Sequence, residues 1–97
     1  MIEQSGDSLR VTVPMVIANA SALLEAGRQC LRASAPGGEA VFDLSAVDEA
    51  DSSALTVIFA WLRTASEGGA TLRVVHPPAS MISLAELYGV SDFLPFA

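Results

Sequence analysis

Hydrophobic and polar positions along this chain follow two different periods. In the segment SLRVTV, residues 8–13, apolar side chains alternate with Ser8, Arg10 and Thr12. An alternation with a period of two is typical of a β-strand that has one face in water. The turn residues SGD precede this segment, so we expect residues 1–5 to form the partner strand of a hairpin.

Two longer segments follow the period of an α-helix. From Asn19 to Leu31, apolar residues recur at steps of three and four, with polar residues opposite them. Asn19 is the predicted N-cap of this helix, and APGG at residues 35–38 ends it. A second helix is predicted over residues 52–67, where the following glycine pair, 68–69, forms the C-cap.

Apolar segments of a different kind flank the second helix. AVFDL, residues 40–44, is a nearly continuous apolar run, which is typical of a strand covered on both faces. TLRVVH, residues 71–76, is predicted as the next strand, and its spacing suits a right-handed β-α-β crossover. A third helix is predicted over residues 79–88 and ends at Gly89. We expect the apolar tail, residues 90–97, to pack back onto the body.

The predicted order of elements is therefore β-β-α-β-α-β-α. This order predicts an α/β sandwich, a small mixed sheet with about three packed helices, in one domain over residues 1–97. The chain is 52% hydrophobic and 16% charged, which is typical of a packed globular domain. A chain of this size buries only about 60–65% of its unfolded surface, so a large ligand cavity would take much of its core. Its size therefore argues against an enzyme.

The charge pattern excludes several classes of partner. The net charge is −6, the chain has no lysine, and its five arginines are scattered. Nucleic acids and anionic membrane surfaces require clustered basic charge, so neither is expected to bind. The single cysteine, Cys30, cannot form an internal disulfide or a multi-cysteine metal site. With no signal-peptide pattern and no apolar run long enough to insert in a membrane, we expect a soluble, cytoplasmic protein.

Polar chemistry concentrates in DEADSSAL, residues 48–55. Asp51 or Ser52 can act as the N-cap of the second helix, a role worth about 1 kcal/mol. A second serine, Ser53, and a further hydroxyl one turn on at Thr56 exceed what a cap requires. These additional hydroxyls indicate that the start of the helix is also a functional surface.

A helical wheel of residues 52–67 separates a broad apolar arc from a strip of small side chains. We predict that this strip binds a partner and that Asp51 fixes the start of the helix. The predicted binding residues are Asp51, Ser52, Ser53, Thr56, Phe59, Ala60 and Arg63, with Phe59 at the edge of the core arc. Phosphate on Ser53 or Ser52 would be favoured by the helix N-terminus and would add about −1.5 to −2 charge. Phosphorylation would thus make the surface repulsive.

The segment VFDLSAVDEADSSALTVIFAWL, residues 41–62, resembles the core of the STAS domain family, which includes the anti-sigma factor antagonists. In that family a strand ends in DLS, and after a short loop a helix opens with D-S/T-S/G-G/A-L. The resemblance continues through GGATLRVVHPP, residues 68–78, and LAELYGVSDFLP, residues 84–95. It therefore covers nearly the whole chain.

In its shortness and its ending the chain is most similar to the STAS subunits of Mla-type phospholipid ABC transporters, which serve outer-membrane lipid asymmetry. This resemblance implies a non-enzymatic protein without a cofactor that docks on an MlaF-like ATPase subunit and stabilises or regulates it. The ATPase would lie in a complex with a membrane permease, so the protein would be peripheral to the inner membrane through its partner. The docking hydroxyl of this subfamily falls on Ser52.

Similarity to antagonists of the SpoIIAA type implies a different role. In those proteins the regulatory serine falls on Ser53, and its phosphorylation by an anti-sigma factor kinase breaks binding. This chain has serine at both positions, so position alone does not separate the two subfamilies. Ala54 stands where antagonists usually have glycine, and their extra C-terminal strand and helix have no counterpart after Pro95. Both departures favour the transporter subunit.

A third hypothesis is a small hydrolase that uses Ser52 or Ser53. Serine triads assemble from residues far apart in sequence, so His76, the single histidine, could contribute to one. The chain has no Gly-x-Ser-x-Gly motif, however, and we favour a non-catalytic protein. No second histidine or cysteine could join His76 as a ligand set, so we expect no metal site.

Overall fold

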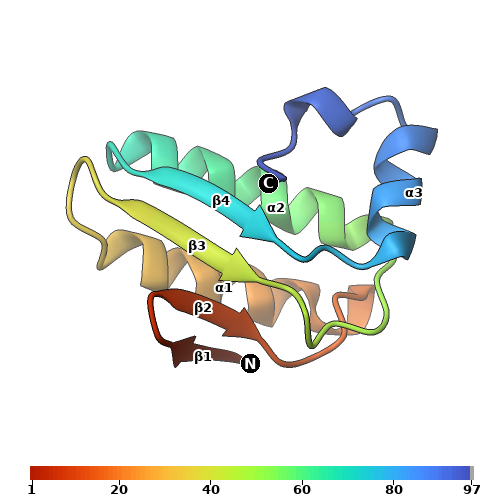
Figure 1. Cartoon of the computed structure of the whole chain (residues 1–97), viewed down its shortest axis with the longest axis horizontal. Coiled ribbons are helices and arrows are strands. Elements are labelled where there is room, and N and C mark those ends of the chain that lie inside the picture. The colour runs from red at the N-terminus through yellow and green to blue at the C-terminus, as the bar shows by residue number, and fades with distance from the viewer. Residues whose placement is uncertain (97) are drawn as a thin grey trace.

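The computed structural model describes residues 1–96 as a single sheet with helices packed against it (Figure 1). Its strands are β1 (Ile2–Ser5), β2 (Ser8–Val11), β3 (Glu39–Asp43) and β4 (Thr71–Val75), and they lie side by side in this order. The helices are α1 (Ile17–Arg32), α2 (Ser52–Glu67), α3 (Ala79–Leu87) and the short 3-10 helix η1 (Ser91–Phe93). The predicted α/β order of elements is confirmed.

The sheet is mixed, as predicted. β1 and β2 form an antiparallel hairpin, while β2, β3 and β4 run parallel to one another. The long helices α1 and α2 lie together on one face of the sheet, and α3 lies beyond the end of β4 (Figure 1). Because the parallel strands all end at the same edge, the starts of α1, α2 and α3 gather near that edge.

The prediction that β3 is covered on both faces is wrong. Ala40 and Phe42 are buried beneath the helices, whereas Val41 and Asp43 are only half-buried. Both long helices cover the same face, so the opposite face of β3 stays partly open. An apolar residue at position 41 made the strand look continuous in sequence, although its burial alternates as in a one-sided sheet.

Trp61, fully buried in the middle of α2, connects three elements of the core. Its indole ring lies 4.5 Å from the Phe42 ring of β3, centroid to centroid, with the two planes tilted by 32°. Its Nε1–H donates a hydrogen bond of 3.2 Å to the backbone oxygen of Leu24 in α1. Gly27 of α1 faces the same ring so closely that a Cβ on it would overlap the indole. The absence of a side chain at Gly27 therefore allows the two helices to approach.

The start of α1 differs from the prediction. The helix begins at Ile17, two residues before the expected cap, and its N-cap residue, Val16, makes no side-chain capping bond. Asn19 lies inside the first turn, and its Nδ2 donates instead to the backbone oxygen of Pro14 at 2.8 Å. The Ile17 N–H is satisfied from another part of the chain, by the carboxylate of Asp51. Local sequence rules cannot identify a cap that comes from 34 residues away.

The later elements end where the sequence indicates. α2 spans Ser52–Glu67 as predicted, and Gly69 after it adopts a φ of +73°, which favours glycine. The tail returns to the sheet as expected, because the Val74 N–H of β4 donates to the Pro95 oxygen at 2.9 Å. Leu94 is buried and Phe96 packs against the core, whereas the Phe93 ring stays largely exposed. Residue 97 lies outside the described residues.

The contact between Gly27 and Trp61 generates a prediction. Alanine is the better helix former by up to about 1 kcal/mol, but its methyl group would be forced into the indole ring. We expect Gly27→Ala to lower the free energy of unfolding by about 1–3 kcal/mol, the usual cost of overpacking. Urea denaturation followed by tryptophan fluorescence measures the change. Gln29→Ala, at an exposed position of the same helix, is the control, and equal stability of both variants would contradict the close approach.

Candidate functional site

Asp51 connects the N-termini of the two long helices. As the N-cap of α2, its Oδ1 accepts hydrogen bonds from the backbone N–H of Ser53, at 2.9 Å, and from the Ser53 hydroxyl. Its Oδ2 accepts from the backbone N–H of Ile17, also at 2.9 Å. One carboxylate therefore satisfies a free amide at the start of each helix. The sequence predicted the cap on α2 but not the bond to α1.

The loops before the two helices are also held together by their backbones. The Met15 N–H donates to the Glu49 oxygen at 2.9 Å, and the Asp51 N–H donates to the Met15 oxygen at 3.1 Å. These bonds form a short parallel bridge between Met15 and Ala50. The Asp51 side chain thus acts within an ordered junction of the two loops.

The hydrogen bonds to Asp51 lower the pKa of its carboxyl below the ordinary value of 3.8. The Ser53 hydroxyl makes the largest contribution and the Ile17 N–H the next, because both donate to the charged form. Asp51 is therefore ionised near neutral pH. A carboxylate occupied in this way serves as a structural acceptor and is poorly suited to take a proton from a substrate.

The predicted strip lies on the solvent side of α2. Ser52, Thr56 and Arg63 are exposed along it, and Ser53, Phe59 and Ala60 are half-buried at its sides. The opposite side of the helix, including Ile58 and Trp61, belongs to the core. The structure therefore brings the predicted binding residues together on one face, next to the junction formed by Asp51.

An apolar groove adjoins this strip, between the first turns of α1 and α2. Its volume is about 190 Å³, and two of its lining residues, Ser53 and Thr56, belong to the predicted strip. The remaining lining residues are Ile17, Ala20, Ser21, Leu24 and Val57. The contribution of α1 was not predicted from the sequence. The signal was present in Ile17, Ala20, Ser21 and Leu24, whose spacing of three and four places them on one helical face.

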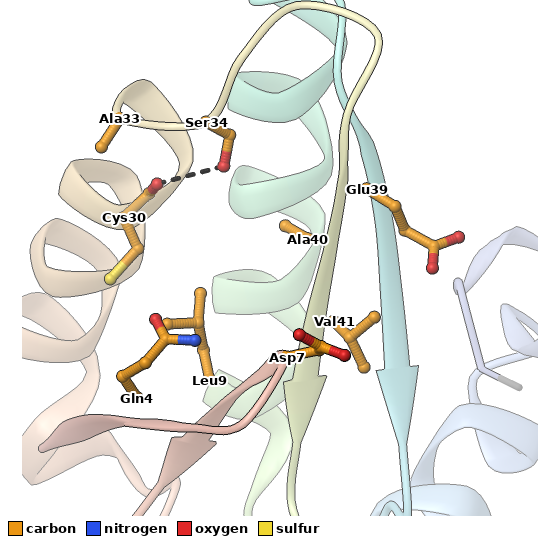
Figure 2. A pocket seen from close by; sticks show the side chains of 9 residues that line it. All are labelled: Gln4, Asp7, Leu9, Cys30, Ala33, Ser34, Glu39, Ala40 and Val41. Carbon is orange, nitrogen blue, oxygen red and sulfur yellow. Dashed lines mark hydrogen bonds between the residues drawn. The ribbon is translucent and has the colours of Figure 1, made fainter.

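A larger cavity, about 380 Å³, lies at the far end of the sheet (Figure 2). It forms where the β1–β2 hairpin diverges from β3, since β2 pairs with β3 only at Leu9 and Arg10. Three of its polar side chains have partners: the Ser34 hydroxyl donates to the Cys30 oxygen at 3.3 Å, the Gln4 amide donates to the Gly6 oxygen at 2.8 Å, and the Glu39 carboxylate lies 3.9 Å from the Arg73 guanidinium. Asp7 is the remaining charged side chain of the lining. This cavity offers no convergent set of free polar groups.

The histidine and the serines of the hydrolase hypothesis have different partners. The Nδ1 of His76 lies 3.2 Å from Oδ1 of Asp43, at the end of β4 and β3, whereas the Ser53 hydroxyl donates to Asp51. Within residues 1–96, no three potential ligands among histidine, cysteine and acidic side chains cluster around a shared point. Over the same residues, none of the helices is both long and apolar enough to cross a bilayer.

Comparison with known proteins identifies the class of the chain. The family model described as "Mlab, STAS domain" matches residues 2–95, so the chain belongs to this family of STAS domains. A curated relative is the "Intermembrane phospholipid transport system binding protein MlaB" of Haemophilus influenzae, which is 32% identical over 53 residues. That alignment covers 55% of this chain and 50% of the relative, so the chain matches about half the length of that protein.

Two solved structures share the fold. A candidate anti-sigma factor antagonist from Thermotoga maritima superposes with a TM-score of 0.72 and 17% identity, covering 99% of this chain and 83% of that one. An anti-sigma factor antagonist (STAS) domain protein from Planctomyces limnophilus gives a TM-score of 0.75 with 9% identity, covering 99% and 86%. At these identities the likeness shows the fold alone, and it confirms the predicted STAS-like α/β sandwich.

The two oxygens of Asp51 generate a prediction about pH. Asparagine retains one acceptor oxygen for α2, but its amide group cannot accept from the Ile17 N–H. Because the folded-state pKa of Asp51 lies below 3.8, its contribution is fully present above that value and is lost as the pH falls through the folded-state pKa. We therefore expect Asp51→Asn to unfold at lower urea concentration than wild type near neutral pH.

The difference in urea midpoint should shrink as the pH is lowered below 3.8. Titration of both proteins by circular dichroism in urea measures it. Asp92→Asn, in η1 and outside the junction, is the matched control. If the urea midpoint of wild type exceeds that of Asp51→Asn by the same amount down to acid pH, the role assigned to the Asp51 carboxylate is contradicted.

Proposed function

We propose that this chain is a non-enzymatic docking subunit of an Mla-type phospholipid ABC transporter, and that it binds and stabilises or regulates the ATPase subunit. The observation that carries the proposal is the strip of small hydroxyl and methyl side chains beside the joined helix N-termini. Membership of the MlaB STAS family and the name of the relative in Haemophilus influenzae support the transporter as its setting.

The composition of the strip suits a protein partner. Serine, threonine and alanine are short, so they let a partner backbone approach closely and lose little side-chain entropy when they are covered. Arg63, one of the residue types favoured at interfaces, stands at the far end of the strip. A specific interface needs about 800 Å² on each partner, and the strip with its adjoining groove and loops offers a continuous surface for it.

A non-catalytic role also agrees with the hydrogen bonds of the serines. The Ser53 hydroxyl is a donor to an ionised carboxylate that is itself engaged by two backbone amides. A nucleophilic serine instead needs a neighbouring base that is free to take its proton. ATP hydrolysis and lipid handling would then belong to the partner subunits. In this proposal the protein is cytoplasmic and held at the inner membrane by the ATPase and the permease.

The alternative function is an anti-sigma factor antagonist regulated by phosphorylation. The observation that favours it is the position of Ser52 and Ser53 in the first turn of α2, where amides and the helix dipole stabilise a phosphate. Ser52 is exposed, whereas Ser53 is half-buried with its hydroxyl engaged by Asp51. A kinase acting on Ser53 would have to break that bond, and the resulting phosphate would stand against the Asp51 carboxylate.

The docking proposal is tested by a bulky charge in the middle of the strip. We expect Thr56→Arg to reduce recovery of the ATPase subunit with the tagged chain about tenfold or more, since a centrally placed arginine would be buried without a partner. Thr56 is exposed, so the variant should retain the wild-type melting temperature. Ser83→Arg, exposed on α3 and outside the strip, is the matched control and should recover the ATPase normally.

The same capture from native cells separates the two functions. Mass spectrometry should find an ABC ATPase and a permease with unmodified Ser52 and Ser53. Recovery of a kinase-like anti-sigma factor with phosphate on Ser53 would replace the transporter function with the alternative. Normal recovery of the ATPase by Thr56→Arg would show that docking uses a different surface.

A further inference from the structure

The groove between α1 and α2 has an exposed apolar residue at its mouth. The Ile17 side chain is 74% exposed, although its backbone is fixed by the Asp51 carboxylate. The residues that line the groove are uncharged, and the polar atoms of their side chains are hydroxyls. Covering an exposed isoleucine beside an apolar groove with another apolar group is favourable, because it removes apolar surface from water.

The size of the groove limits what can occupy it. Its volume, about 190 Å³, is smaller than the roughly 300–1,000 Å³ of sites that enclose whole small molecules. A complete phospholipid does not fit, whereas one or two side chains of a partner protein do. Ser53 and Thr56 are shared with the strip on α2, so a partner that covers the strip also reaches the groove.

The charge around the groove indicates the chemistry of the partner. Asp48 and Glu49 are exposed on the loop that leads to Asp51. The backbone oxygen of Glu49 accepts a hydrogen bond from the N–H of Met15, just before α1. The acidic loop therefore lies beside the start of both helices. A partner segment that approaches here is favoured when it carries basic residues facing Asp48 and Glu49.

We propose that the α1–α2 groove receives an apolar side chain of the ATPase subunit, from a segment whose neighbouring basic residue faces Asp48 and Glu49. This inference rests on the proposed docking function and extends its surface from α2 to the first two turns of α1. Ile17 and Leu24 supply the apolar walls from α1, and Val57 supplies one from α2.

The test compares two leucine-sized apolar residues of nearly equal exposure. Ile17 is 74% exposed at the groove, and Leu87 is 76% exposed at the end of α3, outside both groove and strip. The dissociation constant of each variant for the purified ATPase subunit is measured by calorimetry. Ile17→Ser should weaken binding about tenfold, as expected for loss of a buried aliphatic contact, and Leu87→Ser should bind as wild type.

Filling the groove provides an independent measurement. Ala20→Phe places a ring in the groove and should weaken binding at least as much, whereas Ala22→Phe, exposed on another face of α1, should not. Asp48→Lys should slow association and reduce its dependence on salt. All of these binding measurements use the full chain, and circular dichroism checks that each variant is folded.

The outcomes distinguish this inference from the proposed function. Loss of binding in Thr56→Arg with wild-type binding in Ile17→Ser and Ala20→Phe would overturn the groove and leave docking on α2 intact. Wild-type binding in all three would overturn both. Equal weakening by Ile17→Ser and Leu87→Ser would show a general loss of apolar surface and would also overturn the groove as a specific site. If Ala20→Phe does not fold, the Ile17→Ser comparison decides alone.

Discussion

The contact between Trp61 and Gly27 sets the distance between the two long helices, and the candidate site depends on that distance. The indole ring occupies the space that a side chain at position 27 would fill, and it packs against the Phe42 ring of β3. Its hydrogen bond to the Leu24 oxygen also fixes the turn of α1 that lines the groove. The helices are therefore packed tightly at their middle, and the groove lies towards their N-terminal ends.

At the N-terminal ends, the two helices are held together by hydrogen bonds to Asp51 rather than by side-chain packing. The carboxylate uses one oxygen for each helix, so the first turns of α1 and α2 keep a defined relative position without a large side chain between them. This arrangement exposes small hydroxyls, an isoleucine and an acidic loop on one continuous surface. The residues that cap the two helices thus also form the proposed docking surface. Because this surface lies outside the core, it needs no cavity within it.

Much of the fold could be predicted because its signals are local. The alternation in residues 8–13, the helical period of residues 52–67 and the glycines after each helix identified the elements directly. The start of α1 could not be predicted, because its free amide is satisfied by Asp51 rather than by a neighbouring residue. The open face of β3 was missed for a related reason: an apolar residue at position 41 is compatible with both a covered and an uncovered face.

The candidate site was predicted in part for the same reason. The strip on α2 follows from one helical wheel, so its residues could be named from the sequence. The groove forms only when the two helices lie at the right separation, and that separation depends on Gly27. In the sequence, Gly27 looks like any other small residue on the apolar face of the helix. The serines illustrate the limit as well, since only the structure shows that Ser53 is engaged by Asp51 while Ser52 is exposed.

The central claim, that a partner binds at the joined N-termini of α1 and α2, is tested most directly by hydrogen exchange of the chain alone and in complex with the ATPase subunit. Helix ends open more readily than helix middles, so a bound partner that covers them slows the exchange of their amides. We predict slower exchange at residues 17–24 and 51–60 in the complex, with unchanged exchange in the β1–β2 hairpin. Protection of the open sheet face or of α3, with none at the two helix starts, would contradict the account.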